Sequence, residues 1–357
     1  MKNFLRGLRI GYYPGSLDFS APSDRRRFVR YANKRGIDFE FADFNKKYDI
    51  VILNQRADLS VWSCYRFGKT KIIYDAIDSY IFSDKSDWKS SLRGTSKFLT
   101  RQSCYWQPNY KKAVELMCCR ADAVICSTKE QQQAIKPFCL NTHLILDMHD
   151  GDIGVVKKSY ETGDTVHIVW EGLASSGIPM ALMKDALACI FARRKVALHL
   201  ITDPIYYRYH NKFLRCNTVD EVVRYFGALS SNVFVHQWNS FVLSQLAVAA
   251  DLAIIPINLD NLFSAGKPEN KLLLFWRMAL PTVVSATSAY SHAMMLAGLD
   301  LLACADISSW HHALDKLVND IEYRTAVGRT GLRVAQTYYS EEQMMARWDC
   351  VFSSILS

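Results

Sequence analysis

The sequence has no long apolar run and no recognisable secretory signal. No stretch of about 18 or more consecutive apolar residues occurs in the chain, so the sequence predicts no membrane-spanning helix. The N-terminal residues MKNFLRGLRIGYYPG lack the apolar core and the small-residue cleavage site of a secretory signal. These absences predict a cytoplasmic protein.

The sequence also lacks the patterns of disulfide frameworks and metal sites. Its ten cysteines are scattered, with one adjacent pair, Cys118 and Cys119, and no C-x-x-C. In a long chain without a secretory signal, this pattern favours buried, reduced thiols. No Asp-x-Asp motif follows an expected strand, and the chain has no short internal repeat. We therefore expect neither a bound metal nor a cofactor.

Acidic residues are scarce in the first part of the chain. Residues 1–150 contain 25 Lys and Arg against 16 Asp and Glu, a balance of +9, whereas residues 151–357 contain 18 against 19, a balance of −1. The net charge of +8 therefore belongs to the first half, which indicates either nucleic acid or a membrane leaflet as an anionic partner. Because the basic residues form no recognisable nucleic-acid-binding module, we expect the membrane and no nucleic acid.

What the chain does contain is a regular alternation of short apolar strands with helices. In the first half, apolar runs predict strands near residues 8–13, 37–43, 48–54, 70–78 and 121–127. Residues 23–36 predict a helix capped by Ser23 and closed by Gly36. A second series follows the polar segment 150–164, with strands near residues 165–172, 196–203, 232–238, 251–257 and 282–286.

This alternation is typical of parallel βαβ units, so the sequence predicts an α/β protein with two doubly wound, Rossmann-like domains. The predicted domains are residues 1–155 and 156–340, followed by a terminal helix at 341–357 that in one interpretation crosses back to the first domain. In such sheets ligands bind at the carboxyl ends of the strands, and two facing domains leave a cleft between them.

One expected helix begins at such a strand end, within the stretch SAGKPENKLLLFWRMALPTVVSA at residues 264–286. Pro268 suits a first helical turn. Lys267 and Lys271 flank the helix N-terminus, where backbone N–H groups and the helix dipole favour a phosphate. In the alternative, both lysines are solvated residues and Glu269 only complements the dipole.

From residue 165 onward, the motifs ADLAIIPI, GKPENKLLLFWRMALPTVVSA and the terminal helices around the YYS motif resemble one enzyme class. They are similar to the sugar-nucleotide-binding domain of GT-B glycosyltransferases, especially the large retaining, family 4-like group of bacterial polysaccharide and lipopolysaccharide enzymes. The resemblance covers about the last 190 residues, and the first 150 fit in outline. It implies two domains facing across a cleft, with the acceptor bound by the first and the nucleotide sugar by the second.

The chain departs from that family at its best-known polar positions. The family carries two glutamates separated by seven residues, and counting back from Pro281 places these positions at Leu274 and Gly266. The basic residues expected after the first strand of the second domain fall at Leu173 and Ser176. These departures place the family's donor contacts in doubt.

Neighbouring residues are candidates to replace the missing contacts. Lys267 and Lys271 are suited to bind the diphosphate. Glu269, a catalytic candidate, and Asn270 are suited to contact hydroxyls of the sugar or ribose.

Three further donor candidates follow from their positions at strand ends. Gly172 permits close approach of backbone to phosphate, and Glu171 lies beside it. Trp238 occupies the place where the resemblance puts the base, on which its ring would stack. Alternatively, Glu171 forms a salt bridge and Trp238 packs in the core.

The predicted acceptor side lies in the first domain. Asp75 and Asp78 end an apolar strand and are catalytic candidates, because carboxylates there would orient or deprotonate an acceptor hydroxyl. Either one is also a good cap for the next helix. Tyr13 and Gly15, in the loop after the first strand, would border the same cleft.

Residues 85–112 combine basic and aromatic side chains. Five basic residues recur at every fourth position, namely Lys85, Lys89, Arg93, Lys97 and Arg101. On a helix they would form one basic stripe beside Trp88, a composition typical of a segment on an anionic membrane. An exposed lysine-rich helix without a lipid role is the alternative.

These observations predict a glycosyltransferase that moves a sugar from a nucleoside diphosphate to a hydroxyl of a polysaccharide or lipid-linked glycan, peripherally at the inner face of the cell membrane. The resemblance implies retention of configuration and no metal. A different class remains open: a catalytically weak GT-B relative that acts as a binding or assembly partner in glycan synthesis. The missing glutamates and basic residues motivate that alternative.

Overall fold

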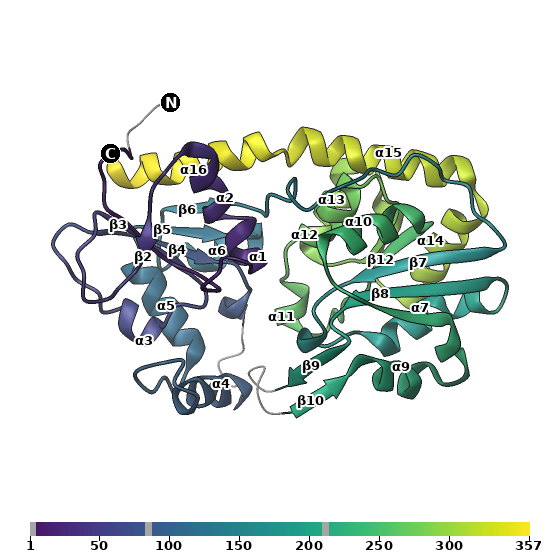
Figure 1. The fold of residues 1–357 in the computed structure, drawn as a ribbon, viewed down its shortest axis with the longest axis horizontal. Coiled ribbons are helices and arrows are strands. Elements are labelled where there is room, and N and C mark those ends of the chain that lie inside the picture. The colour runs from purple at the N-terminus through teal and green to yellow at the C-terminus, as the bar shows by residue number, and fades with distance from the viewer. Residues whose placement is uncertain (1–4, 83–87, 209–213) are drawn as a thin grey trace. The chain divides into compact units, whose positions relative to one another are not determined.

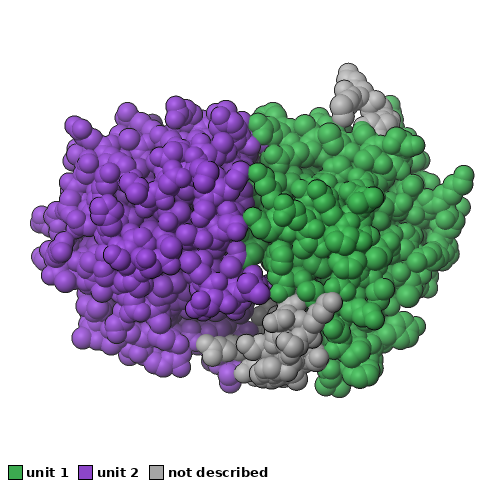
Figure 2. Space-filling model, turned by 180° about the vertical axis from the view of Figure 1, so that it is seen from behind, with its two compact units in different colours: residues 1–148, 266–268, 341–357 green, residues 149–265, 269–340 purple. Residues whose placement is uncertain are grey.

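The computed structural model describes residues 5–82, 88–208 and 214–357 (Figure 1). The chain divides into two compact units (Figure 2). Unit 1 comprises residues 1–148, 266–268 and 341–357, and unit 2 comprises residues 149–265 and 269–340. The first division therefore falls at residue 148, against the predicted 155, and the C-terminal residues from 341 onward belong to unit 1.

Unit 1 is built on a six-stranded parallel sheet with the strand order β2-β1-β3-β4-β5-β6 (Figure 1). Its strands are β1 (Ile10–Tyr13), β2 (Glu40–Phe41), β3 (Ile50–Asn54), β4 (Lys71–Ala76), β5 (Ala123–Cys126) and β6 (Thr142–Leu144). Its helices are α1 (Pro22–Arg25), α2 (Phe28–Arg35), α3 (Leu59–Trp62), η1 (Tyr80–Phe82), α4 (Trp88–Leu99), α5 (Tyr110–Arg120), α6 (Lys129–Ile135) and α16 (Glu341–Leu356).

The sheet of unit 1 is buried on both faces, which explains its continuous apolar strands. On one face, Tyr110 and Met117 of α5 join Trp62 in a core with β3 and β4. On the other face, α2 packs against α16, and Tyr31 stacks on Trp348 with ring centroids 5.5 Å apart. The Tyr31 hydroxyl also donates a hydrogen bond to Asp349 Oδ1 at 2.8 Å. The C-terminal helix is thus an integral part of the unit 1 core.

The helix expected at residues 23–36 is divided in two. α1 ends at Arg25, α2 starts at Phe28, and Arg27 between them has φ −127° and ψ −118°. The prediction that Ser23 caps the helix is wrong, because Ala21 occupies the N-cap position without a side-chain bond. The prediction that Gly36 closes it is confirmed, since this residue has the left-handed φ of 62°.

Unit 2 also contains a six-stranded parallel sheet, in the order β11-β8-β7-β12-β13-β14. The strands of this unit are β7 (Thr165–Glu171), β8 (Lys195–Thr202), β9 (Ile205–Arg208), β10 (Leu214–Asn217), β11 (Val233–Gln237), β12 (Leu252–Ile255), β13 (Thr282–Ser285) and β14 (Ala303–Cys304). Its helices are η2 (Ala174–Ser176), α7 (Met180–Phe191), α9 (Thr218–Phe226), η3 (Gly227–Asn232), α10 (Ser240–Ala249), α11 (Leu262–Ala265), α12 (Asn270–Arg277), α13 (Ser288–Ala297), η4 (Asp300–Leu302), α14 (Ile307–Asn319) and α15 (Ile321–Tyr338).

The strand order of unit 2 reverses between β7 and β12, so the helices that follow these strands leave toward opposite faces of the sheet. α7 packs beside α14, and α12 packs beside α15 (Figure 1). Gly331 of α15 permits the latter contact, because a Cβ atom there would lie 2.6 Å from the Trp276 ring. The loops after β7 and β12 therefore meet at the carboxyl edge of the sheet, where ligands bind in such folds.

The described residues contain three further features that bear on the sequence predictions. β9 and β10 form an antiparallel hairpin in a stretch where no strand was expected. All ten cysteines are free, but only Cys118, Cys126 and Cys304 are buried. In the part of the chain that is described, no helix combines the length and apolar character needed to cross a membrane.

Candidate functional site

A lysine and a glutamate meet at the carboxyl edge of the unit 2 sheet. Lys271 lies in the first turn of α12, and its Nζ donates to the main-chain oxygen of Glu171, the last residue of β7, at 2.9 Å. The same Nζ lies 4.0 Å from Glu171 Oε2 and 5.2 Å from the centroid of the Trp170 ring. The Lys271 side chain keeps 39% of its surface exposed. This ammonium is therefore held at a helix N-terminus and remains accessible to an anion.

Gly172 makes this arrangement possible. A Cβ atom at this position would lie 2.6 Å from Lys271 Nζ and 2.7 Å from the Trp170 ring, closer than side chains tolerate. Its N–H donates to the Ile201 carbonyl oxygen at 3.2 Å. The glycine predicted to allow close approach of a phosphate is thus already closely approached by Trp170 and Lys271.

The other residues predicted around α12 are divided between the two units. Glu269 is buried, with 8% of its surface exposed, and occupies the N-cap position without a side-chain cap bond. Asn270 follows it as the first helical residue, half-buried like Lys271. Lys267 lies in the segment 266–268, which groups with unit 1. The structure therefore brings Glu171, Gly172 and Lys271 together, without adding Lys267 to their unit.

Tyr290 is a buried neighbour of this cluster that the sequence did not single out. Burial raises its pKa well above the ordinary range, and the negative charges of Glu269 and Glu171 add to that shift. The signal available in the sequence was its position in α13, just after β13, whose carboxyl end lies at the same edge of the sheet. Trp170 was equally overlooked, although it directly precedes Glu171.

Trp238, the predicted base-stacking residue, follows the carboxyl end of β11. The backbone N–H of Trp238 donates to the main-chain oxygen of Thr202, which ends β8, at 3.2 Å. The side chain is half-buried. Because β8 separates β11 from β7 in the sheet, Trp238 lies on the same carboxyl edge as Glu171, two strands away. Its stacking role stays a prediction.

In unit 1, Asp75 lies inside β4 and not beyond the strand end. It is 2% exposed, and its Oδ1 and Oδ2 accept from Arg27 Nη2 and Nε at 2.6 and 2.8 Å. Arg27, which is fully buried, also donates to Asp147 Oδ1 at 3.2 Å. Burial raises the pKa of Asp75, and Arg27 opposes that shift. With both oxygens engaged by a buried arginine, Asp75 is placed to hold the core of unit 1 and not to meet an acceptor hydroxyl.

Asp78, the second predicted carboxylate, is half-buried in the loop after β4. Its Oδ2 accepts from Gln55 Nε2 at 2.8 Å, and its N–H donates to Gln55 Oε1 at 2.6 Å. This reciprocal pair holds the loop and leaves part of the carboxylate open to solvent. Asp78 therefore meets the geometric condition for an acceptor contact better than Asp75 does.

Tyr13 is the last residue of β1 and not part of the loop as predicted, whereas Gly15 lies in that loop, which Asp24 holds in place. Gly15 and Ser16 donate their N–H groups to the two Asp24 oxygens at 2.7 and 2.9 Å. Asp24 is itself fully buried and also accepts from the Tyr12 hydroxyl at 2.6 Å. Burial raises the pKa of Tyr13. The loop is thus ordered by one buried carboxylate at the carboxyl edge of the unit 1 sheet.

The predicted basic stripe is not continuous. Lys85 lies outside the described residues, and α4 spans Trp88–Leu99, which contains Lys89 and Arg93. Lys97 Nζ donates to the Tyr110 hydroxyl at 2.7 Å. Arg101 lies beyond the helix, with a left-handed φ of 58°. The prediction of one basic stripe that runs along a single helix from Lys85 to Arg101 is therefore wrong, because α4 ends at Leu99, before Arg101. The membrane role of this segment stays a prediction.

A row of three histidines crosses the unit 2 sheet away from the Lys271 cluster. His167 Nδ1 lies 3.1 Å from His199 Nε2, and His199 Nδ1 lies 3.0 Å from His236 Nε2. Neutral rings make both hydrogen bonds if each donates one N–H to the next. Burial, together with His236 and His167, lowers the pKa of His199 to about 4. Within the described residues no group of three His, Cys, Asp or Glu side chains is arranged to hold a metal.

The lowered pKa of His199 predicts a loss of stability in mild acid. Its folded-state pKa lies below the unfolded value of about 6.5, so the unfolded chain binds more protons and stability falls as the pH drops from about 6.5 toward 4. With an allowance for solvent screening, the contribution is about 1 kcal/mol between pH 7.5 and 5. Urea unfolding at the two pH values should show a smaller acid loss for His199→Gln than for the exposed-site control His312→Gln. Equal losses would contradict the prediction.

The comparisons with known proteins show a shared fold and no close relative. No family model and no curated protein matches the sequence. Among solved structures, a TarM mutant from S. aureus, in complex with fondaparinux, alpha-GlcNAc-glycerol and UDP, aligns with a TM-score of 0.60 at 13% identity over 85% of this chain. This chain spans only 55% of that TarM chain.

Two further solved structures match over nearly the whole chain. Anabaena HepE, in complex with UDP and glucose, has a TM-score of 0.60 at 14% identity and covers 97% of this chain and 100% of its own. A putative UDP-N-acetylglucosamine 2-epimerase from Listeria monocytogenes has a TM-score of 0.54 at 12% identity, covering 97% and 95%. Together with the two six-stranded parallel sheets, these similarities show that the chain has the two-domain, Rossmann-like fold of the GT-B glycosyltransferases.

Proposed function

We propose that the protein is a glycosyltransferase that uses a nucleoside diphosphate sugar. The observation that carries the proposal is the Lys271 ammonium, held by Glu171 at the N-terminus of α12 on the carboxyl edge of the unit 2 sheet. A diphosphate needs positive charge and N–H donors, and a helix N-terminus beside a lysine supplies both. Two structures with the same fold, those of TarM and HepE, contain UDP, which supports the nucleotide as ligand.

In the proposed mechanism, Lys271 and the first-turn amides of α12 stabilise the negative charge that the diphosphate leaving group gains as the sugar departs. The proposal needs no metal, because Lys271 and the amides supply the positive charge. Asn270 and Glu269 contact sugar or ribose hydroxyls, and Trp238 stacks on the base. Retention of the anomeric configuration is part of the proposal and rests on the family resemblance alone.

On the acceptor side, Asp78 is the better candidate to orient an acceptor hydroxyl, because Asp75 is engaged by Arg27. Tyr13 and Gly15 would border the acceptor. The acceptor class we propose is a polysaccharide or lipid-linked glycan, handled at the cytoplasmic face of a membrane. The net positive charge of residues 1–150 supports an anionic membrane surface as partner.

A binding or assembly role without catalysis is the second candidate. The absence of glutamates at positions 266 and 274, and of basic residues at 173 and 176, favours it. The similarity to a putative UDP-N-acetylglucosamine 2-epimerase is consistent with this candidate, because a fold does not fix the chemistry. Release of the nucleoside diphosphate from a bound nucleotide sugar by the purified protein would exclude a purely binding role.

The proposal is tested by thermal unfolding against UDP, GDP, ADP and their glucose conjugates. A ligand that binds only the native state at 100 times its Kd adds about 2.7 kcal/mol to stability, so the Tm should rise by several degrees for one base. The shift should persist in EDTA. Inorganic pyrophosphate serves as the control for nonspecific anion binding. If no nucleotide raises the Tm more than pyrophosphate does, the proposed function is wrong.

A further inference from the structure

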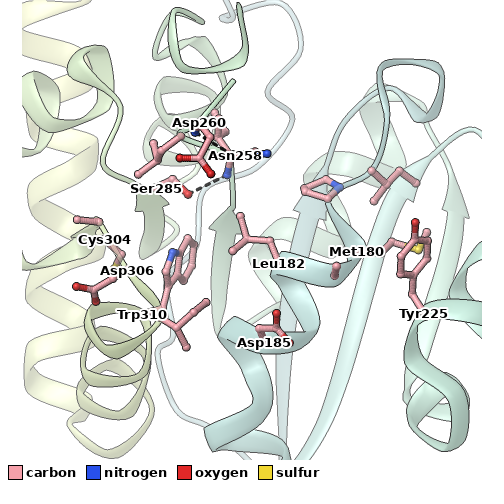
Figure 3. A pocket seen from close by; sticks show the side chains of 17 residues that line it. Met180, Leu182, Asp185, Tyr225, Asn258, Asp260, Ser285, Cys304, Asp306 and Trp310 are labelled. Carbon is pink, nitrogen blue, oxygen red and sulfur yellow. Dashed lines mark hydrogen bonds between the residues drawn. The ribbon is translucent and has the colours of Figure 1, made fainter. Parts of the chain in front are cut away.

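Unit 2 contains a cavity that is separate from the Lys271 cluster. It has a volume of about 600 Å³ and lies at the carboxyl ends of β12, β13 and β14, between the N-termini of α7 and α14 (Figure 3). None of the residues that line it belongs to the group Trp170, Glu171, Gly172, Lys271 and Tyr290. Its volume falls within the range of about 300–1,000 Å³ typical of small-molecule sites.

The charge of the lining distinguishes this cavity from a phosphate site. Asp185, Asp260 and Asp306 contribute carboxylates, and no Lys, Arg or His lines it. One oxygen of Asp306 already accepts from Ser309 N and Oγ at 2.8 and 2.9 Å, which leaves its other oxygen available. A nucleoside diphosphate would therefore meet like charge here, and the cavity favours a ligand that donates hydrogen bonds.

Trp310 and Ser285 bring two hydrogen-bond donors to the same cavity. Trp310, 2% exposed, extends from α14 toward the end of β13 (Figure 3), and its indole N–H has no acceptor among the described residues. Ser285, also 2% exposed, accepts from the Ile257 N–H at 2.8 Å, and within the described chain its own hydroxyl proton has no acceptor. A ligand with acceptor oxygens can accept hydrogen bonds from both groups in place of water.

We propose that this cavity binds an uncharged sugar unit. A hydroxyl group both donates and accepts, so one sugar ring serves the carboxylates and also the Trp310 and Ser285 donors. A protonated amine would suit the carboxylates but leave both donors unmet, because an ammonium group accepts no hydrogen bond. Leu182, Ile257 and Tyr225 supply apolar walls for the C–H faces of the ring. The inference does not depend on the proposed transferase activity.

The test uses glucose, N-acetylglucosamine and maltose at millimolar concentration as probes. In spectra of protein labelled with ¹⁵N-tryptophan, the indole signal of Trp310, assigned by its loss in Trp310→Phe, should shift with at least one probe. Saturation-transfer NMR of the same probes needs no assignment and covers the case in which that variant does not fold. The double variant Asp185→Asn/Asp260→Asn should bind the sugar probe about tenfold more weakly, because a carboxylate is a stronger hydrogen-bond acceptor than the amide that replaces it.

The outcomes separate this site from the nucleotide site. Lys271→Met and added UDP should leave the binding of the probe unchanged. Binding that disappears with either change would place the sugar in the nucleotide site and overturn the inference. No saturation transfer from any of the three probes, or equal affinity in the double aspartate variant, would overturn it as well. UDP binding is followed in parallel, so failure of this inference is distinguishable from failure of the proposed function.

Discussion

Replacement of Arg27 by methionine is expected to lower the free energy of unfolding of unit 1 by about 3–5 kcal/mol. Arg27 is fully buried and pairs with Asp75 and Asp147. Burial lowers its pKa, but the two carboxylates outweigh burial, so the pKa of Arg27 is raised and the residue is charged at every physiological pH. Removal of the guanidinium would leave two carboxylates in the core without their cation, which is the costly way to break a buried ion pair.

The measurement is urea unfolding of the full chain, followed by the fluorescence of Trp348 and the other tryptophans. Arg9→Met is the matched control, since it also breaks an arginine–carboxylate pair. The Arg9–Glu40 pair has side chains that are 52% and 42% exposed, so its loss should destabilise the protein far less than loss of the Arg27 pair. Similar losses for the two variants would show that burial does not set the importance of the Arg27 pair.

A double-mutant cycle of Arg27→Met with Asp75→Asn extends the same test. If the two side chains act on each other, the double variant should be more stable than the sum of the single losses predicts. A purely structural Asp75 also requires that the folded Asp75→Asn variant keep its affinity for acceptor. Loss of acceptor binding in a variant of unchanged stability would restore Asp75 as a site residue.

Most strands of both sheets were predictable because each is a short, apolar run, whereas β6 and β14, with three and two residues, are too short to give that signal. β3, β4 and β5 are buried on both faces, so apolar composition alone marked them. The break between α1 and α2 was not predictable, since it turns Arg27 toward Asp75, a partner 48 residues away. The β9–β10 hairpin also escaped, because each strand has only four residues, which mix aliphatic, aromatic and polar side chains and give too short a pattern to favour strand over loop.

The candidate site was predictable to the extent that topology places residues together. Glu171 and Lys271 are 100 residues apart, yet both lie at the carboxyl edge, one at a strand end and the other in the helix after the next strand in the sheet. Position along the sequence could not show that Trp170 contacts the lysine, because that contact depends on the absence of a side chain at Gly172. The Trp310 cavity left no signal, since its lining comes from five separate segments of the chain.

Lys271→Met is expected to weaken UDP binding by about 10- to 100-fold, equivalent to about 1.4–2.7 kcal/mol. The substitution keeps a long, flexible side chain beside Trp170 but removes the ammonium group at the N-terminus of α12. Because Lys271 is 39% exposed, the unfolding midpoint should change little. Calorimetric titration with UDP gives the affinity, and the loss should shrink at high salt, where the lysine–phosphate attraction is screened.

Lys316→Met is the matched control for this prediction. Lys316, in α14 of the same unit, also lies over an aromatic ring, with Nζ 4.1 Å from the Tyr323 centroid, but it is not part of the Lys271 cluster. The Lys316→Met substitution also removes one positive charge from unit 2, so a general electrostatic effect would weaken UDP binding in both variants. Lys271→Arg, which keeps the charge, should retain most of the affinity. If Lys271→Met binds UDP within twofold of the unaltered protein while Lys316→Met does not, the phosphate site lies elsewhere in unit 2, and the assignment of the α12 N-terminus is wrong.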